Sequence, residues 1–429
     1  MYYSLKNNLK LNFRNAVTQG ISKDGSLFFP KKITKLDKRA LESVKSLSNI
    51  EIGLLVMKDF IGDEIKNSDL IKILEKSISF NFNLVPVGNF YSFELFHGPT
   101  LAFKDVGANF LANSLNLFNS HDKKKSTIIV ATSGDTGAAV AKSFFRMHKF
   151  NVVILYPKNK ITKFQEEQIT SLGENIYPIE IDGSFDDCQS LVKKLLIDYD
   201  VVKKLNINSA NSINIGRWLP QIIYYFIMYR ELLNNKLNKK LAISVPSGNF
   251  GNICAGIVAN KMGLPVEKYI ASTNINDTIP RYLVNQVYKP YKTKRTISNA
   301  MDVNDPSNFP RILKLFENNF KDLKNKFVSY SFNDKETTDE ILLNYNSFNY
   351  ILDPHGSVGL LGLKKFFDSE KKKYTGVFLE TAHPIKFEEN IKSIINNPFG
   401  KSLKTNKRKL NTISIINNFK ILKEIILEI

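Results

Sequence analysis

Lys104 occupies a position that is hard to explain by folding alone. It follows Ala102 and Phe103 in the stretch HGPTLAFKDVGANF (97 to 110), at the predicted start of a helix. A cation there faces the positive end of the helix dipole, which costs about 0.3 to 1 kcal/mol, and apolar neighbours disfavour the charged form of a lysine. The sequence therefore predicts either a side chain that reaches water or a lysine that is not held as an ordinary ammonium.

Two glycine-rich turns, SGDTGAA (133 to 139) and SGNFGN (247 to 252), each follow a predicted strand and precede a predicted helix. Such a turn directs backbone N–H groups at an anion, with the helix dipole behind them. Neither turn matches GxGxxG or GxxxxGK[ST], so a dinucleotide fingerprint and a P-loop are not supported. Either turn taken alone could be an ordinary tight connection. Both turns together with Lys104 suit pyridoxal phosphate, whose aldehyde reacts with a lysine amine and whose phosphate needs N–H donors.

The elements expected to position these residues are those of a parallel α/β sheet. Short β-branched runs lead into Gly/Ser turns, twice with a small-residue helix after the turn, at 126–145, 151–159 and 241–263, and a further strand is expected at 376–384. The stretch before about residue 80 is predicted to be a mostly helical added module. The alternately basic and aliphatic tail at 401–429 indicates a closing helix packed on the body.

Composition and charge argue against several other classes of protein. The 429 residues are 43% hydrophobic and 24% charged, as expected of a large folded chain. The net charge of +19 raises nucleic-acid binding, but only nine of the sixty basic residues are arginine, and the dispersed lysines favour a solvated surface. No run approaches the roughly 20 apolar residues of a membrane span. We therefore expect a cytoplasmic protein without a nucleic-acid or membrane partner.

No metal site is predicted. Cys188 and Cys254 are too few for a disulfide framework and lack a metal-binding spacing. His97 lies in the stretch that contains Lys104, and His383 lies in the stretch TAHP (381 to 384). For both we expect packing and hydrogen bonding rather than proton transfer. His355 is expected to be a turn or wall residue. The histidines are too scattered for a zinc motif: His97, His121, His148, His355 and His383.

Nine stretches, in order along almost the whole chain, resemble threonine synthases of the enteric-bacterial and fungal type, which belong to the fold-type II pyridoxal-phosphate enzymes. Each match is short, but the ordered set is highly specific. The stretches are AVTQGISKDGSLFFP (16 to 30), IGDEI (61 to 65), ELFHGPTLAFKD (94 to 105), ATSGDTGAAVA (131 to 141), SANSINIGR (209 to 217), VPSGNFGN (245 to 252), STNINDTIPR (272 to 281), SNAMDV (298 to 303) and TAHPIKF (381 to 387).

The resemblance implies a fold like that of the tryptophan synthase β chain, with two parallel-sheet domains, helices on both faces of each sheet and a mostly helical N-terminal module. It implies an N-terminal region at 1–80 and a catalytic region at 81–429. The smaller lobe would lie at about 119–204, inserted in the larger lobe, and a helical tail at about 401–429. The implied monomer or homodimer is a lyase that converts O-phospho-L-homoserine and water to L-threonine and phosphate, by γ-elimination and then β-addition of water. This is the last step of threonine biosynthesis.

The resemblance also implies roles for the residues that bind the cofactor. Lys104 matches the catalytic lysine that forms a Schiff base with pyridoxal phosphate. Thr381 matches the hydroxyl partner of the pyridine nitrogen, and Asp135 stands where related enzymes have an asparagine beside the ring hydroxyl. The cradle for the cofactor phosphate is implied at Gly248, Asn249, Phe250, Gly251 and Asn252.

Two further elements are implied to bind the substrate. The turn that contains Thr132, Ser133 and Thr136 resembles the one that grips the substrate carboxylate. The substrate phosphate needs a second site. An arginine suits a phosphate because its planar fork donates two parallel hydrogen bonds. A solitary arginine, however, is often only a structural ion-pair partner. The candidates for this second phosphate site are Asn211, Ser212, Asn214, Arg217 and Lys386.

Three alternative functions remain open. Another pyridoxal-phosphate enzyme, such as threonine dehydratase or cysteine synthase, would not need the second phosphate site. A catalytically inactive binding or regulatory protein could share the fold, but intact Lys104, SGNFGN and Thr381 argue against it. Nucleic-acid binding would appear as a salt-dependent shift on DNA. Whether Asp105 tunes Lys104 or caps its helix is also open, and we favour the cap.

Overall fold

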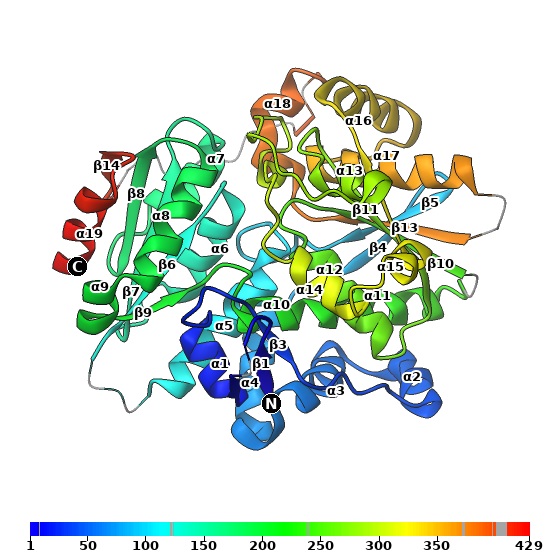
Figure 1. Ribbon diagram of the computed structural model, residues 1–429. Coiled ribbons are helices and arrows are strands. Elements are labelled where there is room, and N and C mark those ends of the chain that lie inside the picture. Colours follow the sequence, from blue (N-terminus) through cyan, green and yellow to red (C-terminus); the bar gives the residue numbers. More distant parts are fainter. Residues whose placement is uncertain are drawn as a thin grey trace.

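The computed structural model describes residues 1–7, 9–120, 122, 124–237, 240–370, 374–396, 398–399 and 410–429. Figure 1 shows two lobes side by side, each built on its own β-sheet, with the N-terminal module below them. No helix in these ranges is both long and apolar enough to cross a membrane.

The larger lobe contains a six-stranded sheet of order β12-β11-β10-β13-β5-β4. Neighbouring strands are parallel, except that β4 and β5 form an antiparallel hairpin at one edge. Side chains alternate between the two faces of a strand: Ile243 packs in the core that includes α12, and Ala242 packs in the core that includes α17. The strands are β4 (Asn83–Val87), β5 (Phe90–Glu94), β10 (Lys240–Pro246), β11 (Val266–Thr273), β12 (Phe327–Ser331) and β13 (Tyr374–Glu380).

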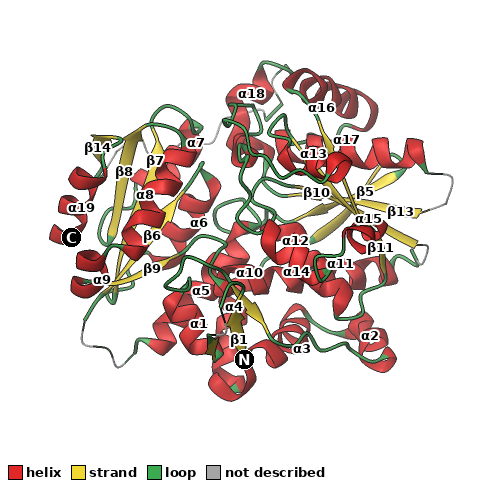
Figure 2. Ribbon diagram, viewed as in Figure 1, coloured by secondary structure: helices red, strands yellow, loops and turns green. Residues whose placement is uncertain are grey.

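The helices of the larger lobe cover both faces of its sheet, as Figure 2 shows. They are α5 (Lys104–Phe118), α10 (Ile215–Trp218), η3 (Leu219–Gln221), α11 (Ile222–Asn234), α12 (Gly251–Lys261), α13 (Thr278–Asn285), η4 (Asn299–Met301), α14 (Phe309–Leu315), α15 (Phe320–Lys326), α16 (Asp334–Phe348), α17 (Pro354–Ser369), η5 (Pro384–Phe387) and α18 (Glu388–Lys392).

The smaller lobe contains a fully parallel five-stranded sheet of order β14-β8-β7-β6-β9. Ile128 packs in the core that includes α6, and Ile129 packs in the core that includes α8, so helices again cover both faces. The strands are β6 (Ser126–Ala131), β7 (Phe150–Pro157), β8 (Ile176–Asp182), β9 (Asn206–Ser209) and β14 (Ile413–Ile416). The helices are α6 (Asp135–Phe144), α7 (Lys163–Thr170), α8 (Phe185–Ile197), α9 (Tyr199–Lys204) and α19 (Phe419–Glu428).

The C-terminal tail differs in part from the expected helix. Residues 413–416 form β14, which runs parallel to β8 at the edge of the smaller sheet. The stretch ISII contains three β-branched isoleucines, which favour a strand. Only α19 is helical, and it buries Leu422 and Ile426 in the core of the smaller lobe. Residues 401–409 of the expected tail lie outside the described residues, and β9 extends the lobe beyond residue 204.

The N-terminal module is mostly helical, with one small antiparallel sheet of order β2-β1-β3. Ser48 and Glu51 form a capping box at the start of α3, which satisfies the free N–H groups there. The fold class predicted from the sequence is confirmed in both lobes and in this module. Its elements are β1 (Tyr2–Ser4), β2 (Lys10–Leu11), α1 (Phe13–Gln19), β3 (Phe28–Pro30), α2 (Lys38–Ser43), η1 (Val44–Ser46), α3 (Asn49–Ile61), η2 (Gly62–Glu64) and α4 (Asn67–Ile78).

Candidate active site

A cavity lies between the lobes, at the carboxyl ends of β6 and β10, where parallel sheets usually bind ligands. Polar and apolar side chains of both lobes line it, as expected of a site for a small polar ligand. The lining residues are Phe103, Lys104, Ala131, Ser133, Asp135, Thr136, Phe185, Asn211, Ser212, Arg217, Gln221, Pro246, Ser247, Gly248, Asn249, Phe250, Gly251, Asn252, Ala300, Met301, Val303, His355 and Thr381.

A short ladder between two loops places Lys104 beside Thr381. The N–H of Phe103 donates to the carbonyl of Thr381 at 2.9 Å, and the N–H of His383 donates to the carbonyl of Leu101 at 3.0 Å. Leu101 has φ +59°, a left-handed conformation that is uncommon for leucine and needs support from its surroundings. The ladder therefore holds the strained turn and fixes both cavity residues relative to each other.

The electrostatic surroundings of Lys104 favour its neutral form. Burial lowers the pKa of Lys104, and the nearby positive charges of Lys386 and Arg217 lower it further, while Asp135 partly opposes them. The ammonium nitrogen lies 3.5 Å from the nearer carboxylate oxygen of Asp135. The geometry is consistent with the prediction that Lys104 is not held as an ordinary ammonium.

Asp105, next to Lys104, does not cap its own helix. Its carboxylate accepts hydrogen bonds from the N–H of Thr100 at 2.9 Å and from the hydroxyl of Thr100 at 2.5 Å. Burial raises the pKa of Asp105 to about 6, although these hydrogen bonds oppose the rise. Asp105 therefore closes the loop that leads into Lys104. It acts neither as a helix cap nor as a direct partner of the lysine.

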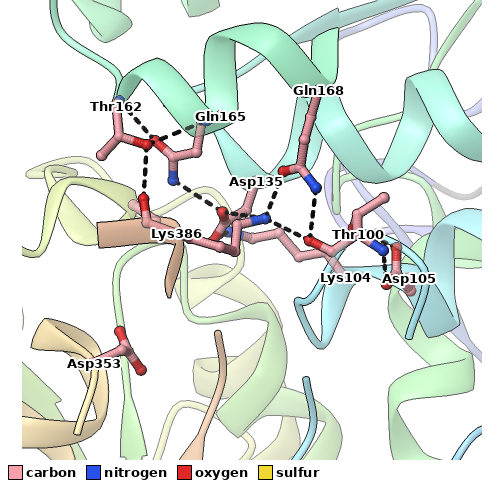
Figure 3. Close-up of polar contacts among 12 residues, drawn as sticks. Thr100, Lys104, Asp105, Asp135, Thr162, Gln165, Gln168, Asp353 and Lys386 are labelled. Atoms are coloured by element: carbon pink, nitrogen blue, oxygen red, sulfur yellow. Dashed lines mark hydrogen bonds and ion pairs between the residues drawn. The ribbon is translucent and has the colours of Figure 1, made fainter. Parts of the chain in front are cut away.

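Asp135 lines the cavity and takes part in the polar contacts drawn in Figure 3. Its Oδ1 lies 3.1 Å from the Lys386 ammonium and accepts a hydrogen bond of 2.9 Å from Gln165. Burial alone would raise the pKa of Asp135, but the positive charges of Lys386 and Lys104 outweigh it and hold the pKa well below its usual range. Asp135 is therefore an ionised carboxylate at the start of α6.

The SGNFGN turn is shaped to leave its N–H groups free for an anion. Phe250 has φ +58° and ends the turn at the start of α12. A Cβ on Gly248 would lie 2.7 Å from the Cα of Met301, so only glycine fits. No acceptor is found in the described part of the chain for the N–H groups of residues 248–250 or for the buried Nδ2 of Asn252. These free donors fit the phosphate of pyridoxal phosphate.

The asparagine side chains of this turn hold it in place. The Oδ1 of Asn249 accepts a hydrogen bond of 2.6 Å from the N–H of Ser307, and its Nδ2 donates to the hydroxyl of Ser212 at 3.1 Å. The Oδ1 of Asn252 accepts a hydrogen bond of 2.7 Å from the hydroxyl of Tyr225. Asn249 and Asn252 therefore support the cradle, while the free donors come from the backbone and from the Nδ2 of Asn252.

Thr381 and His355 form another part of the cavity wall. The hydroxyl of Thr381 has no hydrogen-bond partner among the described residues, so it is available to a ring nitrogen. The Nδ1 of His355 lies 2.5 Å from a carboxylate oxygen of Asp353, and its Nε2 accepts a hydrogen bond from the N–H of Ala300 at 3.2 Å. Both ring nitrogens of His355 are engaged, which fits the wall residue expected from the sequence.

Arg217 lies at the cavity without a carboxylate partner in the described part of the chain. Its Nη1 donates to the carbonyl of Ala210 at 2.6 Å, while its buried Nε has no acceptor there. Burial lowers the pKa of Arg217 to about 10, and Asp105 partly opposes this. A buried cation with an unused donor is better explained by an anionic ligand than by a structural ion pair.

Comparisons with known proteins identify the family of this chain. The family model for pyridoxal-phosphate dependent enzymes matches residues 86–379, and the model for the threonine synthase N terminus matches residues 1–78. A threonine synthase of Buchnera aphidicola subsp. Baizongia pistaciae is 44% identical over 434 residues, which cover 100% of this chain and 99% of that protein. The chain belongs to the threonine synthase family.

Solved threonine synthases share its whole fold. The crystal structure from Escherichia coli has a TM-score of 0.92 and 38% identity, covering 100% of this chain and 99% of that one. A pyridoxal-phosphate-bound threonine synthase from Brucella melitensis has a TM-score of 0.89 and 30% identity, with coverages of 100% and 98%. The predictions of the family, of a pyridoxal-phosphate cofactor and of a lyase are confirmed. A threonine deaminase from Solanum lycopersicum, at 16% identity and a TM-score of 0.55, shows only a related fold.

Three residues that the threonine synthase resemblance assigned to the substrate do not line the cavity. The hydroxyl of Thr132 accepts hydrogen bonds from the N–H groups of Gly134 and Gly137 at 2.9 and 2.8 Å, so it shapes the turn from behind. The side chain of Asn214 caps α10 and donates to the carbonyl of Val17. We therefore give Thr132 and Asn214 structural roles.

Lys386 is the third of these residues. It is completely buried, and its Nζ donates to the carbonyl of Thr100 at 2.6 Å and to the Oε1 of Gln168 at 2.9 Å, in addition to the ion pair with Asp135. All of its donors are therefore used inside the protein. We remove Lys386 from the substrate site because no donor remains for a substrate phosphate.

Sequence reasoning missed several residues that build the site. Phe185 and Gln221 line the cavity but carry no local signal, whereas Ala300, Met301 and Val303 lie in the SNAMDV match. Arg311 is fully buried and donates to the carbonyl of Ser212 and to the Oδ1 of Asn308, which in turn donates to the Ser212 hydroxyl. Only the three-dimensional contacts reveal Arg311 and Asn308.

The described residues contain no group of His, Cys, Asp and Glu side chains that could hold a metal ion. Cys188 and Cys254 are both buried and unpaired with each other. His121 lies outside the described residues.

Proposed function

We propose that this chain converts O-phospho-L-homoserine and water to L-threonine and phosphate, as the last step of threonine biosynthesis. The observation that carries the proposal is the presence of two separate sets of anion donors in one cavity. One set is the free N–H groups of residues 248–250 with the Nδ2 of Asn252, and the other is centred on Arg217. Two phosphates, one on the cofactor and one on the substrate, account for both sets, whereas a dehydratase would leave the second without a ligand.

The residues of the larger lobe fit pyridoxal phosphate. We propose that Lys104 binds the aldehyde carbon, that the N–H groups of Gly248 to Asn252 bind the phosphate, and that the Thr381 hydroxyl donates to the pyridine nitrogen. Bound in this way, the cofactor supplies an electron sink for charge that develops at the substrate α-carbon. A hydroxyl partner leaves the ring nitrogen neutral, so more of the catalytic burden falls on positioned bases.

The remaining cavity donors suit the substrate. Ser133 and Thr136 line the cavity at the start of α6, with hydroxyls that have no partner in the described ranges, and we assign them to the substrate carboxylate. The Ser212 hydroxyl accepts from Asn249 and Asn308, so its own proton is free to donate. We assign Ser212 and Arg217 to the substrate phosphate. The Asn211 side chain also lines the cavity but is paired with the backbone of Ala131.

Lys104 is the proposed acid and base. With pyridoxal phosphate bound, the Lys104 amine would remove the proton from the substrate α-carbon and would deliver protons to the carbons that react later. The lowered pKa of Lys104, caused by burial, makes the neutral amine accessible for this task. Phe103, Phe185 and Phe250 line the cavity and limit the access of water before the addition step.

The experiment that tests the function is an assay of the purified holoenzyme with O-phospho-L-homoserine, in which phosphate and threonine are both measured. We expect equimolar release of the two products. Release of phosphate with a 2-oxo acid and no threonine would instead support a dehydratase-like enzyme, and no turnover would support an inactive binding protein.

A variant tests the second phosphate site in the same assay. Ser212→Ala removes one neutral hydrogen bond, worth about 0.5 to 1.5 kcal/mol, and should raise the KM up to about tenfold. Arg146→Leu removes an exposed arginine that pairs with Glu174 and serves as the control. An unchanged KM in Ser212→Ala would place the substrate phosphate elsewhere.

The finer organisation of the protein also remains a proposal. We propose an N-terminal region at 1–80 and a catalytic region at 81–429, working as a monomer or homodimer in the cytoplasm on a small-molecule substrate, without nucleic acid. Gel filtration and a DNA-binding assay at two salt concentrations test the assembly state and the absence of nucleic-acid binding.

A further inference from the structure

Lys386 is a completely buried lysine for which the proposed function has no use. Figure 3 shows its ammonium between two lobes, with every donor occupied. The contacts are 2.6 Å to the carbonyl of Thr100, 2.9 Å to the Oε1 of Gln168 and 3.1 Å to the Oδ1 of Asp135. Two neutral acceptors and one carboxylate stabilise the charged form of a lysine, so the arrangement holds Lys386 as a cation.

Asp135 faces two lysines through its two oxygens. Its Oδ1 contacts Lys386 at 3.1 Å, and its Oδ2 contacts Lys104 at 3.5 Å. Gln165 fixes the carboxylate with a hydrogen bond of 2.9 Å to Oδ1. The Gln165 carboxamide packs over Gly134, which has φ +128° and no room for a Cβ. The closer, better-fixed partner of Asp135 is therefore Lys386, and Lys104 is the more distant one.

The polar contacts around Asp135 form a hub that joins the two lobes. Asp135 belongs to the smaller lobe, as do Gln165 and Gln168 on α7, whereas Lys104 and Lys386 belong to the larger lobe. The backbone of Lys386 is also held, because the Thr162 hydroxyl donates to its carbonyl at 2.9 Å. Lys386 thus has a fixed position relative to Asp135.

We propose that Lys386 is a positioning residue that supplies the permanent countercharge of Asp135, so that Lys104 can lose its proton without leaving an unpaired carboxylate inside the protein. A buried carboxylate is strongly destabilised when it loses its only cation. With Lys386 in place, Asp135 stays paired when Lys104 becomes neutral. The proposal rests on the role given to Lys104 above.

The other charged groups near the hub do not replace Lys386. Asp105 is engaged with Thr100, and Arg217 donates to Ala210. Both ring nitrogens of His355 are occupied, and burial lowers the pKa of His383, which disfavours a positive charge on that ring. The charges that lower the pKa of Asp135 are, from the largest to the smallest, those of Lys386, Lys104 and His355. Removal of Lys386 would therefore leave Asp135 with Lys104 as its remaining ion-pair partner among the described residues.

The test is a pH titration of the visible absorbance of the holoenzyme. This absorbance reports the protonation state of the Lys104 nitrogen that holds the cofactor. In Lys386→Met we expect the midpoint to rise by about one pH unit or more, because Asp135 then stabilises only the protonated form at Lys104. Lys386→Gln removes the charge but keeps a donor, and it should show the same rise. Lys386→Arg keeps the charge and should restore the midpoint towards the wild-type value.

Two further variants complete the design. Adding Asp135→Asn to Lys386→Met should lower the midpoint again, because the carboxylate that holds the proton is gone. Lys163→Met removes an exposed lysine of the same lobe interface, whose ion pair with Glu389 is 2.8 Å, and should leave the midpoint unchanged.

A midpoint that stays at the wild-type value in both Lys386→Met and Lys386→Gln would overturn the inference and leave Lys386 a purely structural role. Borohydride reduction of the wild-type holoenzyme separates this failure from a failure of the proposed function. If the cofactor is trapped on Lys104, the titration tests the proposed role of Lys386. If the cofactor is trapped on another residue, the role of Lys104 itself is refuted.

Discussion

The two glycine-rich turns, at 133–139 and 247–252, have the same place in their lobes but opposite electrostatics. Each follows a parallel strand and opens a helix at the cavity. The first turn carries Asp135, whose carboxylate faces two lysines, whereas the second has no ionisable side chain. A turn that brings its own carboxylate organises cations, and a turn without one offers its N–H groups to a ligand.

The two turns are also held in different ways. Gln165 covers Gly134 in the first turn and binds Asp135, so the support reaches the charged group itself. In the second turn, the backbone of Met301 lies against Gly248, and Asn249 is tied to Ser212 and Ser307. The supports in the second turn therefore leave the backbone donors uncovered.

The largest effect should come from Lys104→Ala, which removes a lysine that Asp135 of the charged turn faces. We expect kcat to fall by about 10⁴-fold or more, because covalent attachment and proton transfer are lost together. The variant should also lose the yellow colour of the lysine-bound cofactor. Steady-state kinetics and absorbance measure both effects, with the exposed Lys142→Ala as the control. An active, yellow Lys104→Ala enzyme would remove Lys104 from the mechanism.

Gly248→Ala should break the uncharged turn alone. The new Cβ must push against the Met301 backbone, and overpacking of about 1 to 3 kcal/mol should weaken cofactor binding by about 5- to 150-fold. Gly134→Ala, in the charged turn, should instead raise the KM for the substrate and lower the melting temperature, with cofactor affinity less affected. Equilibrium dialysis of the cofactor compares the two. Equal losses of cofactor affinity would show that the turns do not have separate ligands.

Thr381→Val should have a smaller effect that extends the contrast. The Thr381 hydroxyl, the proposed partner of the ring nitrogen, is uncharged, as is the turn at 247–252. Its loss removes one hydrogen bond of about 0.5 to 1.5 kcal/mol and should weaken cofactor binding by up to about tenfold. Thr381→Ser keeps the hydroxyl and should retain near wild-type affinity. If Thr381→Val binds the cofactor as tightly as the wild type, the hydroxyl does not contact the ring.

The last comparison concerns how the free energy of unfolding depends on pH. The pKa of Asp135 is held below its ordinary value by Lys386 and Lys104, although burial opposes them. Its stabilising contribution is therefore fully present above about pH 4 and is lost as the pH falls further. The difference in unfolding free energy between wild type and Asp135→Asn should be constant from about pH 8 to 5 and shrink below about pH 4.

Asn249→Ala in the uncharged turn is the matched comparison. It should lower the free energy of unfolding by about 1 to 3 kcal/mol at every pH, because the groups whose hydrogen bonds it removes do not titrate in this range. Urea unfolding at several pH values measures both variants. A pH-dependent difference for Asn249→Ala, or a constant one for Asp135→Asn, would contradict the assignment of charge to the first turn alone.

The sequence predicted the parts of this site that are local. Lys104, the SGNFGN turn and Thr381 each lie in a short motif, and the structure brings them to one cavity. The alternation of β-branched runs and small-residue helices predicted a parallel α/β sheet, and the resemblance to threonine synthases implied the second one.

What could not be predicted depends on side-chain direction and long-range pairing. Lys386 looked like a phosphate ligand because it is a cation in a matching motif, but its ammonium points to Asp135 and Thr100 instead of the cavity. Arg311 and Asn308 lie about a hundred residues from Ser212 in the sequence. The short strand β14 pairs with a strand over two hundred residues earlier, and a tail with helical periodicity gives no sign of that.

The most direct test of the account is borohydride reduction of the purified protein with pyridoxal phosphate, followed by peptide mapping. We predict one cofactor per chain, attached to Lys104 in the peptide that contains Phe103 and Asp105. Attachment to Lys386, to another lysine or to none would contradict the claim that Lys104 is the residue that holds the cofactor.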